Sequence, residues 1–212
     1  MASEKDFADK LLERAYNLKT EEEAKALYKD WADTYDETML SDLGYLTPLK
    51  TAELLSTFLE DKSSRILDIG CGTGLAGAAL VRRGFAHLDA LDYSVEMLDV
   101  AAKREIYSNL HVADLTKEIS LASDTYDAAI CTGTFTHAHV GADCLDELFR
   151  ILKPGALFAC TIHKDVWEPA GFEAKVHQLE SACIILNRHM QEGTYFENTE
   201  EPEGFYMLWE KL

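Results

Sequence analysis

From residue 64 onward, short apolar runs alternate with segments in which apolar residues recur every three or four positions. The short runs predict strands over 65–69, 87–91, 110–112, 126–131 and 156–162. The segments with helical spacing predict helices over 75–83, 95–104, 142–152 and 172–182. Strands that alternate with helices favour right-handed crossovers and a mostly parallel sheet. Because these strands are almost continuously apolar, we expect helices on both faces of the sheet.

The two ends of the chain follow different patterns. Apolar residues spaced three to four apart predict helices across residues 1–60. Within that stretch, Thr47 has the form of a helix cap, and Pro48 suits the first position of the helix that follows. Near the other end, 183–188 and 205–209 predict two strands that are close enough in sequence to pair as a hairpin.

Together these patterns predict an α/β fold. We expect a seven-stranded, mostly parallel, Rossmann-like sheet with helices on both faces, an antiparallel C-terminal hairpin and a helical N-terminal extension. The chain has 212 residues, of which 47% are hydrophobic, and no Pro/Gly/Ser-rich linker divides it. We therefore expect an N-terminal helical cap over 1–60 and one globular domain over 61–212.

Charge narrows the choice of partners. The chain carries 38 acidic and 20 basic residues, for a formal net charge of -18. Such a surface repels phosphate backbones and anionic lipid heads, so nucleic acid and membranes are disfavoured as partners. A small-molecule partner is favoured instead, and the pattern predicts no particular oligomeric state.

Cysteine usage and hydropathy suggest the compartment. The five cysteines are odd in number and show no CxxC spacing, which is typical of reduced thiols inside a cell. The charged first ten residues predict no secretory signal. No apolar run approaches the roughly 18–20 residues that a transmembrane helix needs. These features predict a cytoplasmic protein.

The first candidate for chemistry is the glycine-rich run that follows the first strand. Gly70 and Gly72 allow a sharp turn and a close backbone approach to a ligand, which open α/β sheets bind at the carboxyl ends of their strands. Residues 72–77 also fit the dinucleotide pattern G-x-G-x-x-G, so an NAD(P)-dependent oxidoreductase is one alternative. However, the glycines begin two residues early, and Asp68 would repel a pyrophosphate. The same carboxylate would attract the ammonium and sulfonium of S-adenosylmethionine.

Two further carboxylates end the next strands. Asp92 lies where a carboxylate can accept hydrogen bonds from both hydroxyls of a ribose. Tyr93 and Met97 follow it and suit an apolar wall for an adenine ring. After the third strand, Asp114, next to Leu115, is placed to accept a hydrogen bond from an adenine amine.

These motifs resemble those of class I S-adenosylmethionine-dependent methyltransferases. The resemblance rests on D-x-G-C-G-T-G at 68–74, on the acidic end of the second strand, on the Asp after the third strand and on Leu-Lys-Pro-Gly at 152–155. The segments 31–36 and 43–48 are similar to the N-terminal region of small stand-alone members, the methyltransferase-like group typified by the Williams–Beuren-region protein.

The resemblance implies methyl transfer from S-adenosylmethionine and assigns cofactor contacts. The implied contacts are Asp68, Gly70, Cys71, Gly72, Asp92, Tyr93, Asp114, Leu115 and Thr132, with Tyr35 closing over the cofactor. Two departures from the family pattern occur. Ala156 replaces a second glycine after the Lys-Pro-Gly turn, and the small Gly133-Thr134 pair leaves the acceptor side unassigned.

The catalytic prediction is narrower. The product leaves as a neutral thioether, so no acid is required, and holding the reactants in line supplies much of the rate. A base is needed only if the acceptor must lose a proton. His137, just after the fourth strand, is the candidate general base, with His163 as a second candidate. His137 and His139 lack a third ligand at a suitable spacing, so no metal is expected.

We expect a small-molecule acceptor, because 212 residues leave little room for a macromolecular recognition domain. Position alone suggests an apolar acceptor pocket formed by Trp31, Tyr35, Tyr45, Phe135 and Trp167. The alternative is a regulatory protein that binds S-adenosylmethionine without turnover, since no catalytic group is demonstrable from sequence.

Overall fold

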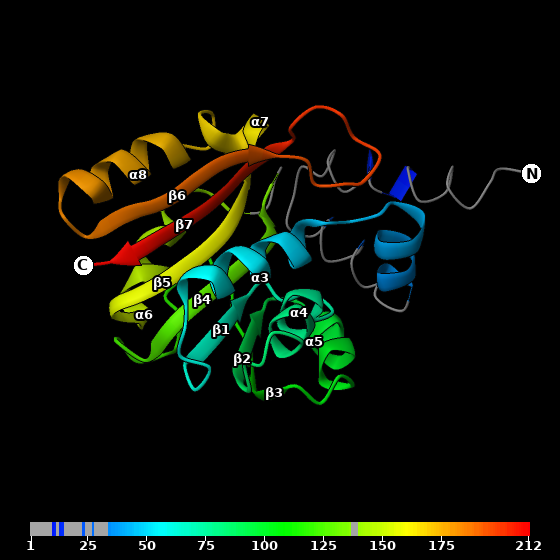
Figure 1. Ribbon diagram of the computed structural model, residues 1–212, viewed down its shortest axis with the longest axis horizontal. Helices are drawn as coiled ribbons and strands as arrows, with labels where there is room; N and C mark the ends of the chain where they lie inside the picture. The colour runs from blue at the N-terminus through cyan, green and yellow to red at the C-terminus, as the bar shows by residue number, and fades with distance from the viewer. Residues whose placement is uncertain (1–9, 12, 15–22, 24–26, 28–33, 137–139) are drawn as a thin grey trace, which may run out of the picture.

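The computed structural model describes residues 10, 11, 13, 14, 23, 27, 34–136 and 140–212 (Figure 1). At its centre lies a seven-stranded sheet in the order β3-β2-β1-β4-β5-β7-β6. The strands are β1 (Arg65–Ile69), β2 (His87–Asp92), β3 (Tyr107–Val112), β4 (Tyr126–Phe135), β5 (Leu152–His163), β6 (Ile185–Gly193) and β7 (Gly204–Lys211). Strands β1 to β5 are parallel to one another, whereas β7 runs antiparallel to both of its neighbours, β5 and β6. The predicted fold class is confirmed.

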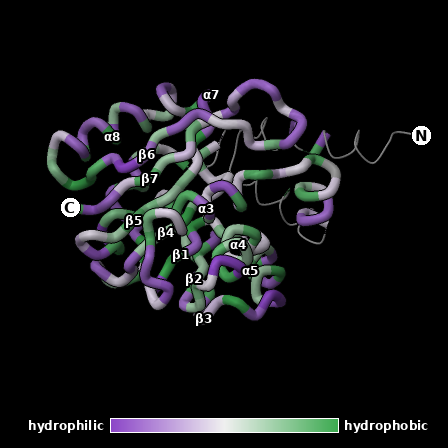
Figure 2. The backbone as a smooth tube through the Cα atoms, viewed as in Figure 1, coloured by the Kyte–Doolittle hydropathy of each residue, from purple (hydrophilic) through white to green (hydrophobic). Residues whose placement is uncertain are grey.

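Helices cover both faces of the sheet, and each face has its own hydrophobic core. The helical elements are η1 (Glu37–Asp42, a π-helix), α3 (Thr47–Phe58), α4 (Leu75–Val81), α5 (Val95–Ala102), α6 (Cys144–Ile151), α7 (Lys164–Trp167) and α8 (Phe172–Ser181). Helices α3 and α4 pack on one face, and α6 and α8 on the other. Figure 2 shows hydrophobic residues along the central strands, whereas the loop between β6 and β7 is mostly hydrophilic. This pattern is expected of a sheet buried on both sides.

Aromatic side chains anchor the core under α6. Phe149 of this helix lies 5.8 Å from Phe158 of β5 and 6.0 Å from Trp209 of β7, measured between ring centroids. All three side chains are buried. Large interlocked rings of this kind contribute strongly to stability, so they fix the antiparallel β7 against the parallel part of the sheet.

The element boundaries differ from the sequence prediction in a few places. Strand β4 continues four residues further than expected, to Phe135, through a shift in its register with β5. Helix α3 begins one residue early, with Leu46 as its N-cap and Thr47 as its first residue, so the predicted Thr47 cap is wrong. The described residues between 10 and 27 are helical, but most of the predicted N-terminal helices lie outside the described residues.

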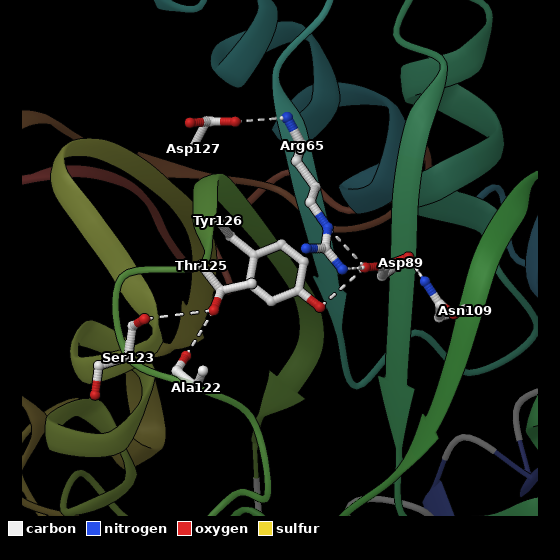
Figure 3. A network of polar contacts seen from close by, with 8 residues as sticks. All are labelled: Arg65, Asp89, Asn109, Ala122, Ser123, Thr125, Tyr126 and Asp127. Carbon is white, nitrogen blue, oxygen red and sulfur yellow. Dashed lines mark hydrogen bonds and ion pairs between the residues drawn. The ribbon is translucent and has the colours of Figure 1, made fainter.

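A polar network ties together the amino ends of β1 to β4 (Figure 3). The buried carboxylate of Asp89 accepts hydrogen bonds from Arg65 Nη2 at 2.6 Å, Tyr126 Oη at 3.0 Å and Asn109 Nδ2 at 2.8 Å. The Arg65 guanidinium also lies 4.8 Å from the centre of the Tyr126 ring. Because Asp89 accepts hydrogen bonds from all three partners, its buried charge is compensated, and the network links the amino ends of the four strands.

The segment that follows η1 packs against β7 and the loop between β6 and β7. Tyr45 contacts Phe196 at a ring-centroid distance of 5.3 Å and belongs to a cluster with Tyr195 and Tyr206. An isolated bridge between Tyr45 and Phe196 and a hydrogen bond from Leu46 N to the Tyr195 carbonyl (2.8 Å) join the backbones. This segment is therefore held beside the carboxyl ends of β4 and β5. In the part of the chain that the structure describes, no helix is both long and apolar enough to cross a bilayer.

Candidate functional site

A cleft of about 880 Å³, open to solvent, lies at the carboxyl ends of the parallel strands. It is lined by Tyr35, Gly70, Gly72, Leu91, Asp92, Tyr93, Ser94, Met97, Ala113, Asp114, Leu115, Thr116, Thr132, Gly133, Thr134 and Val140. Its place is the one where open α/β sheets bind ligands. Nine of the eleven predicted cofactor residues line it, and the exceptions are Asp68 and Cys71.

The glycine-rich loop forms one wall of the cleft. Gly70 has φ +61° and Gly72 has φ +53°, a region that favours glycine. A Cβ on Gly70 would collide with the hydroxyl of Thr134, which comes from the end of β4. The glycines thus let the loop turn into α4 while keeping its backbone open to the cleft and close to β4.

Asp92 is held in place before any ligand arrives. Its Oδ2 accepts a hydrogen bond from Gly72 N at 2.8 Å, and its Oδ1 accepts one from Ser94 N at 2.9 Å. Only 7% of the residue is exposed, and burial raises the pKa of its carboxyl despite these bonds. A carboxylate has about four acceptor positions, so Asp92 keeps capacity for a hydroxyl group in the cleft.

Asp114 lines the far end of the cleft, beside Leu115. Its Oδ1 accepts hydrogen bonds from Thr116 N at 2.9 Å and Thr116 Oγ1 at 2.6 Å, and its Oδ2 pairs with Lys117. Partial burial raises the pKa of this carboxyl, but Lys117 and Thr116 outweigh it and lower the pKa to about 2. Asp114 is therefore a fixed, ionised acceptor, with less free capacity than Asp92.

Asp68 lies beneath the glycine loop and does not line the cleft. Its Oδ2 accepts hydrogen bonds from Gly77 N at 2.9 Å and Tyr107 Oη at 2.5 Å, while the buried Oδ1 has no hydrogen-bond partner. Burial raises its pKa to about 7. Cys71 is also buried, which raises the pKa of its thiol well above the ordinary value. The structure thus places Asp68 as a support of the loop and leaves one of its oxygens unsatisfied.

The remaining wall comes from the end of β4. The register shift beyond Cys131 turns Thr132, Gly133 and Thr134 into the cleft, and Gly133 N donates to Thr161 Oγ1 at 3.3 Å. A Cβ on Gly133 would approach the Tyr45 hydroxyl to 2.7 Å. Bulges of this kind often redirect side chains next to active sites. This wall is polar but uncharged.

The predicted catalytic and acceptor residues have mixed outcomes. His137, His139 and Trp31 lie outside the described residues. His163 is not part of the cleft lining; instead its Nδ1 accepts a hydrogen bond from Asp165 N at 3.2 Å and caps α7.

Of the four described residues among those expected to form an apolar acceptor pocket, only Tyr35 lines the cleft. Phe135 packs against Phe172 in the core, and Trp167 packs against Phe205. Tyr45 is buried in the cluster with Phe196. The described residues also hold no group of three or more side chains of the His, Cys, Asp and Glu types that would hold a metal ion.

Besides Gly133 and Thr134, which it left unassigned, sequence analysis missed one polar connection and five lining residues: Leu91, Ser94, Ala113, Thr116 and Val140. Asp36, next to Tyr35, contacts both Thr73 of the glycine loop and Arg104 beyond α5. No spacing rule links these positions, because they are distant in sequence. Ala113 and Thr116 flank the predicted Asp114 and Leu115, so a wider window around the third strand's end would have included them.

Comparison with known proteins places this geometry in context. Residues 67–160 match the family described as "Methyltransferase domain". The chain is 31% identical over 161 residues to methyltransferase-like protein 27 of Homo sapiens, covering 73% of this chain and 65% of that protein. It is 36% identical over 106 residues to a ubiquinone biosynthesis O-methyltransferase of Xylella fastidiosa, covering 48% of this chain and 43% of that one. The chain thus spans less than two-thirds of the length of either relative.

A solved structure extends the likeness to the fold. The S-adenosylmethionine-dependent methyltransferase of Aquifex aeolicus superposes with a TM-score of 0.63 over 87% of this chain and 98% of its own. Its sequence is 19% identical, so this likeness concerns the fold alone.

Proposed function

Since the chain carries a class I S-adenosylmethionine-dependent methyltransferase domain, we propose that it transfers a methyl group from S-adenosylmethionine to a small-molecule acceptor. The observation that carries the proposal is the pair formed by Asp92 and Gly72 N at 2.8 Å, which presents a fixed carboxylate beside an open glycine backbone. Asp92 would hold the ribose, and Tyr93, Met97 and Leu115 would flank the adenine.

The buried carboxylate of Asp68, below the glycine loop, also fits a cationic cofactor. Asp68 Oδ1 is a buried acceptor without a hydrogen-bond partner, directly under the loop. S-adenosylmethionine, when bound, supplies a methyl group on a positively charged sulfur that becomes a neutral thioether. The chain's own contribution is to bind, orient and shield from water, with carboxylates placed where positive charge is favourable.

The acceptor is proposed to be a small, uncharged molecule. Gly133, Thr134 and Val140 line the cleft, carry no charge and have no assigned cofactor role, so we propose that they face the acceptor. The name of one relative, a ubiquinone biosynthesis O-methyltransferase, supports a small acceptor. The net charge of -18 disfavours nucleic acid as the acceptor.

The experiment follows a labelled methyl group. The protein is incubated with methyl-labelled S-adenosylmethionine and a cell extract that has been separated by size into small molecules and macromolecules. We expect label in the small-molecule fraction, and no transfer by the Asp92→Asn variant. Label that appears only on protein or nucleic acid would contradict the proposed acceptor class.

A second candidate is cofactor binding without turnover. Among the described lining residues, Asp92 and Asp114 are the only acidic side chains, no His, Cys, Lys or Arg is present, and both carboxylates are already hydrogen-bonded. If the chain bound S-adenosylmethionine but no fraction accepted the label, this second function would replace the first.

A further inference from the structure

Three segments that are distant in sequence meet beside the cleft. Asp36 Oδ1 accepts a hydrogen bond from Thr73 Oγ1 at 2.5 Å, and Asp36 Oδ2 pairs with the guanidinium of Arg104. Arg104 Nε in turn donates to the Thr73 carbonyl at 2.5 Å. The three residues thus form a closed set of contacts, which we call the Asp36 anchor.

The anchor joins two parts of the cofactor cleft. Thr73 lies between Gly72 and Gly74 and is 1% exposed, so its position fixes the glycine loop. Gly72 of that loop donates the hydrogen bond that orients Asp92. Tyr35, which immediately precedes Asp36 in the sequence, also lines the cleft. A displacement of Asp36 would therefore move the wall that Tyr35 provides.

The anchor is also partly shielded from solvent. The side chains of Arg104 and Asp36 are 24% and 38% exposed, so water screens their attraction only in part. All three contacts involve a charged group, and such hydrogen bonds are stronger than neutral ones. These contacts therefore favour docking of the segment that carries Tyr35 in the free protein.

We propose that Asp36 is a positioning residue for cofactor binding: by bridging Thr73 and Arg104, it holds Tyr35 over the cleft. This inference rests on the proposed function. A segment that is docked in advance spares the ligand the cost of ordering it, whereas a segment docked only part of the time lowers the apparent affinity by that fraction. Asp36 itself need not touch the cofactor.

The first test measures the affinity and dissociation rate of S-adenosylhomocysteine, which binds without turnover. We expect Asp36→Asn to weaken binding about five- to tenfold, which corresponds to the loss of one charge-assisted contact, and to act mainly on the dissociation rate. In a Tyr35→Ala background the same substitution is expected to change binding less than about twofold, because Asp36 acts through Tyr35. Effects of Asp36→Asn that are equal in both backgrounds would overturn the inference.

A matched control separates the anchor from a general loss of charge. Asp127, at the amino end of the central strand β4, pairs with Lys153 at 2.7 Å, and its side chain is 36% exposed, close to the 38% of Asp36. Asp127→Asn is expected to leave the affinity and the dissociation rate unchanged. If Asp127→Asn weakened binding as much as Asp36→Asn, the effect would be nonspecific and the proposal would fail.

The second test requires no ligand. Hydrogen exchange of residues 34–46 in the free protein reports the docking of this segment, through amides such as Thr38 N and Tyr45 N, which donate to backbone carbonyls at 3.0 and 2.8 Å. We expect faster exchange in Asp36→Asn than in the wild type, and no change in Asp127→Asn. Equal exchange in Asp36→Asn and the wild type would overturn the anchor. If the wild type bound no adenosyl ligand, the proposed function would fail, and this measurement would still decide whether the anchor exists.

Discussion

Replacing Asp68 with asparagine is expected to stabilise the protein increasingly as the pH rises. Burial raises the pKa of this carboxyl from 3.8 to about 7, despite the hydrogen bonds from Tyr107 and Gly77. A shift of about three units corresponds to about 4 kcal/mol, since each unit is worth about 1.4 kcal/mol. Between pH 4 and pH 7 the folded state keeps a proton that the unfolded state has released, so this carboxyl lowers stability as the pH increases, and its full cost is reached above pH 7.

The assay is urea unfolding of the wild type and Asp68→Asn at pH 5, 6, 7 and 8. Groups whose pKa values the substitution does not change contribute equally to both proteins. Their titration therefore cancels when the two free energies of unfolding are subtracted. By linkage, roughly 2–3 kcal/mol of the variant's advantage should develop between pH 5 and pH 8. A difference that stays constant over this range would refute the raised pKa of Asp68.

The same substitution is expected to separate stability from binding. At pH 8 the ionised carboxylate attracts the cationic methionyl part of the cofactor, and asparagine cannot. Asp68→Asn should therefore bind S-adenosylmethionine more weakly while being more stable, as is common where a site retains a costly group. Tighter binding by the variant would show that the carboxylate opposes the cofactor.

Four further outcomes are expected. Asp92→Ala should weaken S-adenosylhomocysteine binding by at least about tenfold in calorimetry, and unchanged affinity would remove the ribose assignment. His137→Gln should lower kcat but leave the cofactor Kd unchanged, and an unaltered kcat would exclude His137 as the base. Asp89→Ala should cost about 1–3 kcal/mol in urea unfolding, because it leaves the buried Tyr126 hydroxyl without its acceptor. Hydrogen bonds from Asn109, Arg65 and Tyr126 outweigh burial and lower the pKa of Asp89, so its stabilisation is present above pH 4 and is lost as the pH falls further. Gly77→Ala should lower Tm, because the Tyr107 ring occupies the place of the added methyl group, and a Tm equal to that of the wild type would contradict this packing.

Most of the fold was predictable because its strands and helices carry strong periodic patterns. The parallel order of β1 to β5 and the antiparallel C-terminal hairpin follow from alternation and short connections, and both are confirmed. The π-helix over 37–42 and the extension of β4 to Phe135 were not predicted. The extension depends on tertiary contacts, such as the one between Gly133 N and Thr161, that no local pattern encodes.

The candidate site was also predictable only in part. Asp92 and Asp114 were placed correctly at the cleft, because carboxyl ends of parallel strands converge. The burial of Asp68 under the loop depends on Tyr107, which is 39 positions away, and the Asp36 anchor depends on Arg104, which is 68 positions away. Contacts at such separations arise from packing, so the sequence gives the residue types but not their partners.

The resemblance to class I methyltransferases carried information that residue patterns alone did not. The glycine-rich run fits two kinds of nucleotide cofactor, and the choice between them rested on Asp68 and on the family likeness. The match of residues 67–160 to a methyltransferase domain confirms that likeness. The assignment of individual cofactor contacts remains a prediction that binding measurements must test.

The central claim is tested most directly by titration calorimetry with S-adenosylmethionine, S-adenosylhomocysteine and NADH in parallel. We expect micromolar binding of the two adenosyl ligands, about -8 kcal/mol, and no heat from NADH. Binding of NADH without either adenosyl ligand would contradict the proposed cofactor and favour an oxidoreductase. Binding of none of the three would contradict the proposed cofactor and function, and only the description of the fold would stand.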